Sequence, residues 1–498
     1  MNTRFLQETA TRRAVLGAGA GLAVTPRLVS AQVATPVASP VPEGPGGWFS
    51  YGADLTGAKA VADGLITSAN VTELGPAWRF QVGGPVSSTP VISGGVAYVG
   101  SYDGNLYAID TETGAAVWTY ASGADVMEPN LQVPLGITGS AHIADGVVYV
   151  GDSAANVHAI DASTGDAIWT VRVDEQEAAS IWSSPVVFNG VVYLGVASIA
   201  KEAGFRGSVV ALDAATGESI WETFVVPEDV DGAGVFAVPA IDTTRGVLYV
   251  GTQNAYTEYE APFGYPISLL AIDIATGEVV WAFLAPPNDG ETSPTEDVGF
   301  SASPNLFTAE IDGTSRDLVG VGQKSGQYYA LDRETGALVW STTISPAGFL
   351  GGMEGTAAAA NGVIAIPATD WPEFEGPASG LVSGVDWSTG EVLWTAEQSA
   401  PAASPAAISN DVVFHAGFDG ILHAYALADG TELWSADLGA SVSGGVAVAE
   451  GYVIVGAATP QFAPFITPGD QIHAFAIGAE LATPEASPNS SPAASPES

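Results

Sequence analysis

Short apolar runs alternate with glycine-containing turns along most of this 498-residue chain. A typical stretch has the run V-A-Y-V-G (Val96–Gly100), the turn Y-D-G-N (Tyr102–Asn105) and a second run, L-Y-A-I (Leu106–Ile109). Short runs rich in Val, Ile, Tyr and Trp and bounded by Asp-Gly or Thr-Gly predict strands and hairpins. No helical period of 3.6 residues competes with this pattern, and 60 glycines would suit a helical repeat poorly. The pattern therefore predicts an all-β fold.

A repeated unit, A-x-D-x-x-T-G-x-x-x-W, organises these runs, and its first full copy is Ala108–Trp118. Full copies also end at Trp169, Trp221, Trp281 and Trp340, and looser copies end at Trp394 and Trp434. The tryptophans, of which Trp78 is the first, follow one another at intervals of 40 to 60 residues. Such a period is typical of toroids, solenoids and arrays, and three or four short strands per unit favour a β-propeller. We expect the repeated tryptophans to pack between blades rather than to contact a ligand.

The two ends of the repeat region are incomplete in complementary ways. Trp78 has no lead-in, whereas His473–Gly478 (H-A-F-A-I-G) is a lead-in without a tryptophan. We therefore expect the first strand of the domain to complete the last repeat and to close the ring. Counted this way, the repeats predict an eight-bladed β-propeller over residues 47–478.

The N-terminus has the features of an export signal. Thr11–Gly17 (T-R-R-A-V-L-G) is a twin-arginine motif, an apolar stretch follows at Ala18–Val24, and Val29–Ala31 resembles a signal-peptidase site. The apolar stretch is too short to span a membrane. Residues 1–31 are therefore predicted to be a twin-arginine signal peptide that directs the protein to the periplasm or the cell exterior, without a membrane anchor.

Two segments rich in Pro, Ser and Ala flank the repeats, at residues 32–46 and 479–498. Segments of this composition cannot build a core, and both are predicted to be disordered. The chain as a whole has 47% hydrophobic and only 14% charged residues, which is ample material for a large core.

Charge and cysteine content exclude several classes of function. Four of the 13 basic residues and one acid lie in the predicted signal, which leaves nine bases against 54 acids in the mature chain. This charge disfavours binding to nucleic acid and to anionic membranes, and it suits a salty or acidic exterior or a basic redox partner. The absence of cysteine excludes disulfides, thiolate zinc sites, a lipoprotein anchor and covalently attached c-type haem.

Three of the few cations lie on or near stretches that break the repeat. Lys201 and Arg206 are in V-A-S-I-A-K-E-A-G-F-R-G (Val196–Gly207), and Lys324 is in V-G-Q-K-S-G-Q-Y-Y-A-L-D-R (Val321–Arg333). A protein this acidic needs local cations if it is to hold a polyanionic ligand. The alternative is that these cations pair with surface acids.

The repeat resembles that of the eight-bladed quinoprotein alcohol dehydrogenases, which bind pyrroloquinoline quinone (PQQ) and a metal ion near the propeller axis. The resemblance covers about residues 47–478, and Trp48–Gly57 is similar to the opening segment of that family. The polyvinyl-alcohol dehydrogenase branch is the most similar, because G-Q-K-S-G, a stretch like G-G-M-E-G (Gly351–Gly355) and R-G-S-V-V-A-L-D-A-A-T-G recur there. The resemblance implies PQQ-type repeats in which tryptophans dock between blades.

The resemblance also implies a metal site. The family has a metal-binding Glu five residues before the Gly of an R-G pair, and Glu202 matches it ahead of Arg206 and Gly207. The Asn of the family's G-T-G-N matches Asn254 in G-T-Q-N. The Asp of the branch's D-F-D-F-G-A-S-P matches Asp297 in D-V-G-F-S-A-S-P.

Calcium is the implied metal. Relatives that use lanthanides have a second Asp two positions after the catalytic Asp, and Gly299 occupies that place here. Glu, Asn and Asp provide the hard oxygen ligands that calcium prefers, and calcium would act as a Lewis acid on a quinone carbonyl. By the same resemblance, Asp297 is the catalytic base that takes the alcohol proton.

Three further residues are implied to bind the quinone. Lys324 matches the basic residue that contacts the quinone oxygens, where it would also stabilise charge that develops during catalysis. Phe236 takes the place of a tryptophan that stacks on the quinone in the family. Arg206 is the third expected cofactor-binding residue. Many relatives cover the other face of the quinone with a disulfide of adjacent cysteines, which this chain cannot form.

Two classes of function therefore remain open. The first is an exported, PQQ- and calcium-dependent dehydrogenase that oxidises a small or polymeric alcohol by hydride transfer and passes electrons to a separate acceptor, such as a cytochrome c. The second is a propeller that kept the repeat but lost the cofactor and serves as a binding or assembly scaffold. Matching Glu, Asn, Asp and Lys residues favour the dehydrogenase, because a scaffold has no need of them.

Overall fold

The computed structural model describes residues 47–127, 134–199, 204–256, 264–285, 298–347, 352–371, 378–460 and 466–481. All of these residues belong to one of two compact units, Ser39–Ser498. The predicted signal peptide, the linker at 32–46 and most of the predicted tail lie outside the described residues.

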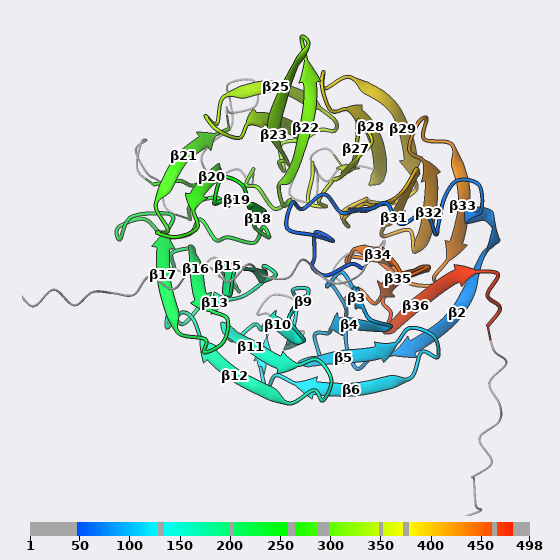
Figure 1. Ribbon diagram of the computed structural model, residues 1–498, viewed down its shortest axis with the longest axis horizontal. Coiled ribbons are helices and arrows are strands. Elements are labelled where there is room, and N and C mark those ends of the chain that lie inside the picture. The colour runs from blue at the N-terminus through cyan, green and yellow to red at the C-terminus, as the bar shows by residue number, and fades with distance from the viewer. Residues whose placement is uncertain are drawn as a thin grey trace, which may run out of the picture. The chain divides into compact units, whose positions relative to one another are not determined.

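Within these ranges the unit forms eight blades around a ring, as Figure 1 shows. The first four blades, from the innermost strand outwards, comprise β3 (Val91–Ser93), β4 (Val96–Gly100), β5 (Asn105–Asp110) and β6 (Ala116–Ala121); β9 (His142–Ala144), β10 (Val147–Gly151), β11 (Asn156–Asp161) and β12 (Ala167–Arg172); β14 (Val186–Phe188), β15 (Val191–Ser198), β16 (Ser208–Asp213) and β17 (Ser219–Phe224); and β18 (Ala240–Asp242), β19 (Val247–Gly251), β20 (Ser268–Asp273) and β21 (Val279–Leu284).

The next four comprise β22 (Asn305–Ile311), β23 (Thr314–Gly322), β24 (Gln327–Asp332) and β25 (Leu338–Thr343); β26 (Ala358–Ala360), β27 (Val363–Asp370), β28 (Ser379–Asp386) and β29 (Val392–Gln398); β30 (Ala407–Ser409), β31 (Val412–Ala416), β32 (Ile421–Ala426) and β33 (Glu432–Asp437); and β34 (Val446–Ala449), β35 (Tyr452–Ala457), β36 (Gln471–Ile477) and β2 (Leu74–Gln81). The remaining elements are β1 (Ala60–Val61), β7 (Val126–Met127), β8 (Pro134–Leu135), β13 (Ala179–Ser180) and a single turn of 3₁₀ helix, η1 (Val71–Glu73). The predicted all-β, eight-bladed propeller is confirmed.

The ring is closed by the N-terminal strand, as the unmatched repeat ends predict. Strand β2 pairs antiparallel with β36, which places Trp78 opposite Ala474. The eighth blade therefore contains three strands from the C-terminal end of the domain and one from its N-terminal end. The eighth blade has its outer strand only because these distant segments meet.

The repeated tryptophans hold neighbouring blades together. Each of the eight donates a hydrogen bond from Nε1 to a backbone carbonyl of the next blade, at distances of 2.7 to 3.1 Å. In seven of these junctions the acceptor is the fourth residue of the repeated unit, for example Ala162 as the acceptor for Trp118 at 2.9 Å. Trp434 instead reaches Leu74 at the start of the closing strand, at 3.1 Å. The expected role of the tryptophans in packing is confirmed.

Glycine in the Thr-Gly turn is required by this docking. The turn begins where an aspartate, such as Asp161, accepts hydrogen bonds from the backbone amides of Ser163 and Thr164. Gly165 then adopts a φ of +77°, and its Cα lies against the indole of Trp118. A Cβ at this position would lie 2.8 Å from the Trp118 ring, so only glycine satisfies both the backbone angle and the contact.

The segment Trp48–Val61, which we call the N-terminal segment, crosses the inner strands at the centre of the ring in Figure 1. Among the described residues it forms backbone hydrogen bonds with six of the eight inner strands: β3, β9, β18, β22, β26 and β30. Its side chains Trp48 and Lys59 are fully buried, and the Lys59 Nζ lies 3.8 Å from the centre of the Tyr51 ring. Burial lowers the pKa of Lys59 well below its usual value. The segment therefore covers one opening of the ring.

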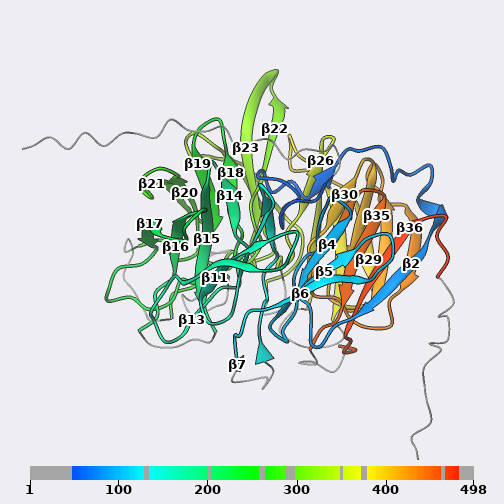
Figure 2. The same cartoon turned by 60° about the horizontal axis from the view of Figure 1, so that its bottom comes forward.

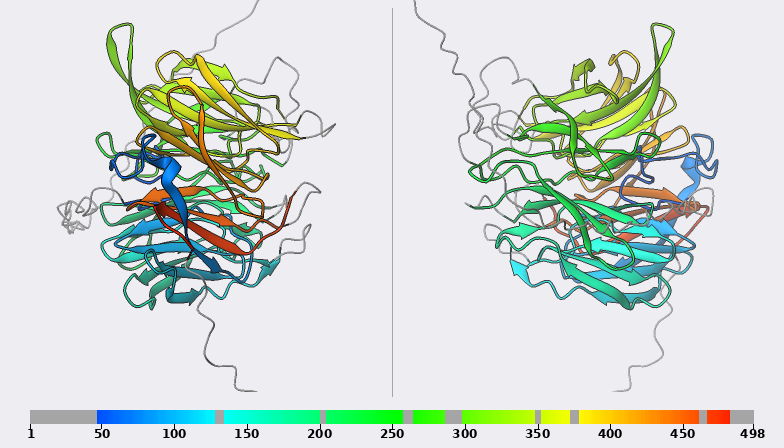
Figure 3. Two further views of the ribbon diagram at one scale, coloured as in Figure 1. Left: turned by 90° about the vertical axis from the view of Figure 1, so that its right-hand side faces the viewer. Right: turned by 60° about the vertical axis from the view of Figure 1, so that its left-hand side comes forward.

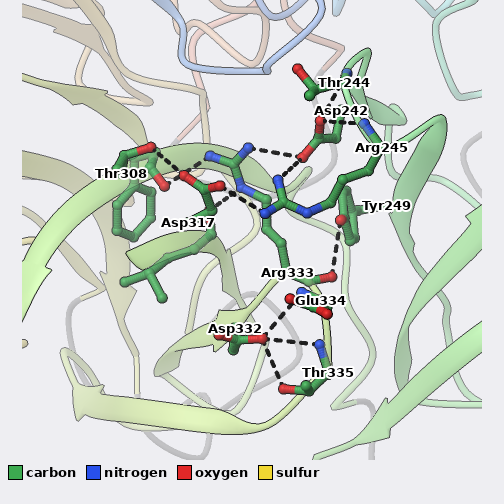
Figure 4. A network of polar contacts seen from close by, with 12 residues as sticks. Asp242, Thr244, Arg245, Tyr249, Thr308, Asp317, Asp332, Arg333, Glu334 and Thr335 are labelled. Atoms are coloured by element: carbon green, nitrogen blue, oxygen red, sulfur yellow. Dashed lines mark hydrogen bonds and ion pairs between the residues drawn. The ribbon is translucent and has the colours of Figure 1, made fainter. Parts of the chain in front are cut away.

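Blades four and five have two additional features. The hairpin of β22 and β23 extends beyond the rest of the ring, as Figures 2 and 3 show. At its base a network of charges joins the two blades (Figure 4). Arg245 binds Asp242 at 2.8 Å and Asp317 at 2.7 Å, and Arg333 binds Asp242 at 3.1 Å. Burial would raise the pKa of Asp242, but hydrogen bonds from the two arginines hold it below its usual value.

Candidate active site

One residue at an equivalent position precedes the inner strand of each blade, and we call these residues the axial row. The row comprises Ser87, Thr138, Trp182, Phe236, Ser301, Glu354, Ala403 and Ser443. The equivalence follows from backbone bonding, because the residues of inner strands that bond to the N-terminal segment each lie five positions after a member of the row. The row therefore lies at the end of the inner strands away from the N-terminal segment, in the residues that lead into these strands.

A belt of hydroxyl groups joins the blades two positions after the row. The backbone amide of Ser303 donates to Thr356 Oγ1 at 2.9 Å, and three other junctions between neighbouring blades have the same type of bond at 2.8 Å. Tyr51 of the N-terminal segment reaches this belt, with its hydroxyl 2.7 Å from Thr356 Oγ1. Burial raises the pKa of Tyr51 to about 12, so its phenol is neutral. Tyr51 thus links the N-terminal segment to the hydroxyl belt, which lies between that segment and the axial row.

Aromatic side chains occupy the row on blades three and four. Phe236, the predicted quinone-stacking residue, packs against Trp182, with ring centres 5.9 Å apart and planes at 47°. Both residues are half-buried. We did not predict a role for Trp182 from the sequence. It stands outside the repeated unit and precedes S-S-P, much as Phe236 precedes A-V-P, and that likeness could have revealed it.

Asn254, a predicted calcium ligand, lies in the turn after β19 and is 5% exposed. Its backbone carbonyl accepts a hydrogen bond from Ala233 at 2.8 Å, which ties the turn to the segment that leads to Phe236. The neighbouring Gln253 donates from Nε2 to Ser301 Oγ of the next blade at 3.1 Å. The turn that carries Asn254 is therefore bonded both to the segment before β18 and, through Gln253, to blade five, and it lies on the same side as the axial row.

Lys324, the predicted quinone-binding cation, lies in the equivalent turn of blade five, after β23. Its Nζ is 2.9 Å from Oε1 of Glu354, the member of the axial row on blade six. Lys324 is 9% exposed, so its ammonium is nearly buried, whereas Glu354 is half-buried. From the sequence, Glu354 was only one residue of the G-G-M-E-G stretch, and no role was predicted for it.

Arg206 contacts the same region through its backbone but not through its side chain. It bridges to Gly232, which leads to Ala233 and Asn254. Its guanidinium, however, lies 4.0 Å from the centre of the Phe224 ring, on the outermost strand of blade three. The prediction that Arg206 binds the cofactor is untested, and its side chain here packs against an outer strand.

Two predicted site residues, Glu202 and Asp297, lie outside the described residues. Two described residues that follow Asp297 in the sequence, Gly299 and Phe300, form backbone hydrogen bonds with the turns of blades five and four. The carbonyl of Gly299 accepts from the Lys324 amide at 3.2 Å, and the Phe300 amide donates to Thr252 at 3.1 Å. The segment at Gly299 and Phe300, which precedes β22, is thus held between the turns that carry Asn254 and Lys324.

The described side chains are of chemical types that suit a quinone ligand. An aromatic pair, a buried amide and a nearly buried ammonium lie on consecutive blades at one end of the ring. In the described ranges, Asn254 alone represents the predicted calcium ligands, and its amide oxygen is a hard donor of the type that calcium prefers. No three His, Asp or Glu side chains in those same ranges are grouped closely enough to hold a metal ion.

Known proteins share both the repeat and the ring. The family described as "Outer membrane protein assembly factor BamB" matches residues 60–196, 121–283 and 378–494, and that described as "Glucose/ethanol/alcohol dehydrogenase, beta-propeller domain" matches 227–348. Polyvinylalcohol dehydrogenases from Pseudomonas sp and Sphingopyxis sp. (strain 113P3) are 29% and 27% identical to this chain, over 78% and 79% of it and 67% of each relative.

Solved structures agree on the fold. The quinohemoprotein alcohol dehydrogenase from Comamonas testosteroni superimposes with a TM-score of 0.75 at 22% identity, covering 88% of this chain and 82% of that one. The structure of BamB from Moraxella catarrhalis gives a TM-score of 0.57 at 16% identity, over 81% of this chain and 99% of that one.

The molecule is thus an eight-bladed propeller of the quinoprotein type. The chain belongs to the PQQ-dependent alcohol dehydrogenase-like propeller family. In the described part of the chain, no helix is both long enough and apolar enough to cross a membrane.

Proposed function

We propose that this protein is an exported PQQ- and calcium-dependent dehydrogenase that oxidises an alcohol. The observation that carries the proposal is the nearly buried Lys324, paired with Glu354 at the end of the ring where Asn254, Trp182 and Phe236 also lie. A cation is costly to bury, and this chain has few of them. Curated relatives named as alcohol dehydrogenases support the same activity.

The predicted site residues would have the following roles in binding and catalysis. Glu202, Asn254 and Asp297 would hold calcium, and Lys324 would bind the quinone oxygens. Bound PQQ with calcium supplies a hydride acceptor whose carbonyl is polarised. Asp297 would remove the proton from the alcohol hydroxyl, and Phe236 would cover one quinone face.

Packing around Gly299 supports calcium over a lanthanide. A Cβ on Gly299 would lie 2.2 Å from Oε1 and 2.8 Å from Cα of Gln253. A second aspartate at this position, as in lanthanide-using relatives, would therefore require the Gln253 turn to move. Gln253 stands where the family has the second glycine of G-T-G-N, so the two departures from the family pattern complement each other.

The substrate and the electron acceptor follow from the relatives and from charge. Two curated relatives are named polyvinylalcohol dehydrogenases, which supports a small or polymeric alcohol as substrate. Another relative is named lupanine 17-hydroxylase [cytochrome c], which supports a separate acceptor of that kind. The strongly acidic chain would favour a basic acceptor and disfavours nucleic acid. Export rests on the twin-arginine motif at Thr11–Gly17.

A second candidate function is a scaffold without cofactor. The match to the family of an outer-membrane assembly factor favours it. That match follows from the repeat, which sets the architecture, and it does not account for a nearly buried Lys324 paired with Glu354 in the axial row.

The decisive experiment adds PQQ and calcium to purified apoprotein and follows dye reduction with a panel of alcohols. Dye reduction that requires both additions supports the dehydrogenase. If PQQ neither binds nor raises the unfolding temperature, the scaffold is the better account. The variant Asp297→Asn serves as the control, because it should lose turnover while keeping its fold.

A further inference from the structure

We propose that Glu354 is a positioning residue that holds the Lys324 ammonium in place for a quinone ligand. The proposal deepens the proposed function and rests on it for the identity of the ligand. Glu354 comes from blade six and Lys324 from blade five, so the pair is assembled only when the two blades meet.

The backbone around the pair shows that it is built into the junction rather than formed by two mobile surface side chains. The Met353 amide donates to the Gln323 carbonyl at 3.2 Å, one residue before each partner of the ion pair. Gly352 adopts a φ of +70°, and a Cβ there would lie 2.1 Å from the Lys324 carbonyl oxygen. The turn of Lys324 is also held from the other side by Gly299. Glycine at 352 is thus required for Glu354 to reach Lys324.

Burial and charge give the pair a physical role. The Lys324 side chain is 11% exposed and that of Glu354 is 27% exposed, so the carboxylate has the better access to water. An ammonium taken out of water is stabilised by a carboxylate at hydrogen-bond distance, and such a charged bond also restricts the rotation of a flexible lysine. Glu354 would therefore stabilise the Lys324 ammonium and hold its Nζ beside the axial row when no ligand is present.

Glu354 differs from the other described members of the axial row in the same sector. Trp182, Phe236 and Ser301 are uncharged. On blades three to five the row thus presents two aromatic rings and a hydroxyl to a planar ligand, and on blade six it presents Glu354, paired with Lys324. Through Lys324, Glu354 would favour ligands with anionic or polar oxygens at one edge. Removal of its charge should weaken the binding of PQQ without the loss of any direct contact to it.

The test compares Glu354→Gln with Glu450→Gln, a matched control. The Glu450 carboxylate also joins neighbouring blades, because it accepts hydrogen bonds from Gly94 and Gly95 at 2.9 Å, but it lies at the junction of blades eight and one. Both variants remove one carboxylate that bridges two blades, so a general loss of stability would appear in both. Only the Glu354 variant should affect Lys324.

The first measurement uses the apoprotein and needs no cofactor. The chain has three lysines, so the rate at which acetic anhydride modifies Lys324 can be followed by mass spectrometry. In Glu354→Gln this rate at pH 8 should rise about tenfold, because the neutral amine is the reactive form and a charged hydrogen bond has been lost. In Glu450→Gln and in the conservative Glu354→Asp it should change little. An unchanged rate in Glu354→Gln would overturn the coupling between the two residues.

The second measurement is a double-mutant cycle on PQQ affinity, determined by equilibrium dialysis. Glu354→Gln should weaken binding about tenfold in the wild-type background and hardly at all in Lys324→Gln, because Glu354 acts only through that lysine. A full effect in the Lys324→Gln background would show that Glu354 touches the ligand itself and would overturn the positioning role. If wild-type protein does not bind PQQ, the proposed function fails, while the labelling rates still decide whether Glu354 controls Lys324.

Discussion

Two glycines of blade two allow the stabilisation from the Trp118 contact to be measured separately from the cost of a strained backbone angle. Gly146 and Gly165 have φ values of +76° and +77°, so alanine at either position must adopt the same left-handed conformation. Around Gly146 there is no atom within 4 Å of an added Cβ, whereas at Gly165 the added Cβ would lie 2.8 Å from the Trp118 ring. The difference between the two substitutions therefore measures the contact with Trp118.

The expected magnitudes follow from these two terms. The left-handed conformation costs alanine about 1–2 kcal/mol, and this is the whole effect expected of Gly146→Ala. Gly165→Ala adds an overpacking term of about 1–3 kcal/mol. The Trp118 indole would have to withdraw, and its 2.9 Å hydrogen bond to Ala162 would weaken as it does so. Gly165→Ala should therefore lower the free energy of unfolding by about 2–5 kcal/mol.

Urea unfolding followed by circular dichroism measures both variants under the same conditions. A second pair of measurements in a Trp118→Ala background supplies the control, because there Gly165→Ala should cost no more than Gly146→Ala. If the two alanine variants are equally stable in the wild-type background, the glycines of the repeat serve only the turn, and the docking explanation is wrong.

Three further predictions concern the site and the charge network. Asp297→Asn should abolish alcohol-dependent dye reduction and leave the urea midpoint unchanged, and retained turnover would refute its role as base. Trp182→Ala should weaken PQQ binding about tenfold in equilibrium dialysis, since one aromatic contact is lost, and unchanged affinity would remove Trp182 from the site. Asp242→Asn should cost about 2 kcal/mol at pH 7, because two arginines lose a charged partner. The folded-state pKa of Asp242 is lowered, so this stabilisation is present above the unfolded pKa of about 3.9 and is lost as the pH falls through the folded value. Unfolding free energies of wild type and variant should therefore converge below about pH 4, and a constant difference would contradict the assignment.

Repetition explains why the architecture could be predicted from the sequence. Each blade needs the same turn and the same tryptophan packed against its neighbour. The pattern from Ala108 to Trp118 therefore recurs and indicates eight equivalent environments. The closure could be inferred as well, since Trp78 and His473–Gly478 are complementary remnants of one unit. The path of the N-terminal segment could not, because an irregular segment that bonds to six different blades has no period of its own.

The site illustrates the opposite situation. Lys324 and Asn254 could be matched by motif, but their neighbours are set by how adjacent blades meet, which no local pattern records. The Lys324–Glu354 pair joins two blades, and its geometry depends on the backbone angle of Gly352. Trp182 was overlooked because tryptophan has a structural role elsewhere in this chain, and its contact with Phe236 again crosses a blade boundary.

The pairing of β2 with β36 also constrains when the protein can complete its fold. The first strand of the pair leaves the ribosome early, but its partner is among the last parts of the domain to be synthesised. At roughly 5–20 residues per second, β36 is synthesised some tens of seconds after β2, the strand with which it pairs. If the protein is exported in its folded form, it must stay on the cytoplasmic side until its own C-terminal strand has emerged. A stop codon ahead of Gln471 would leave β2 without a partner and the ring open, however well the other seven blades had formed.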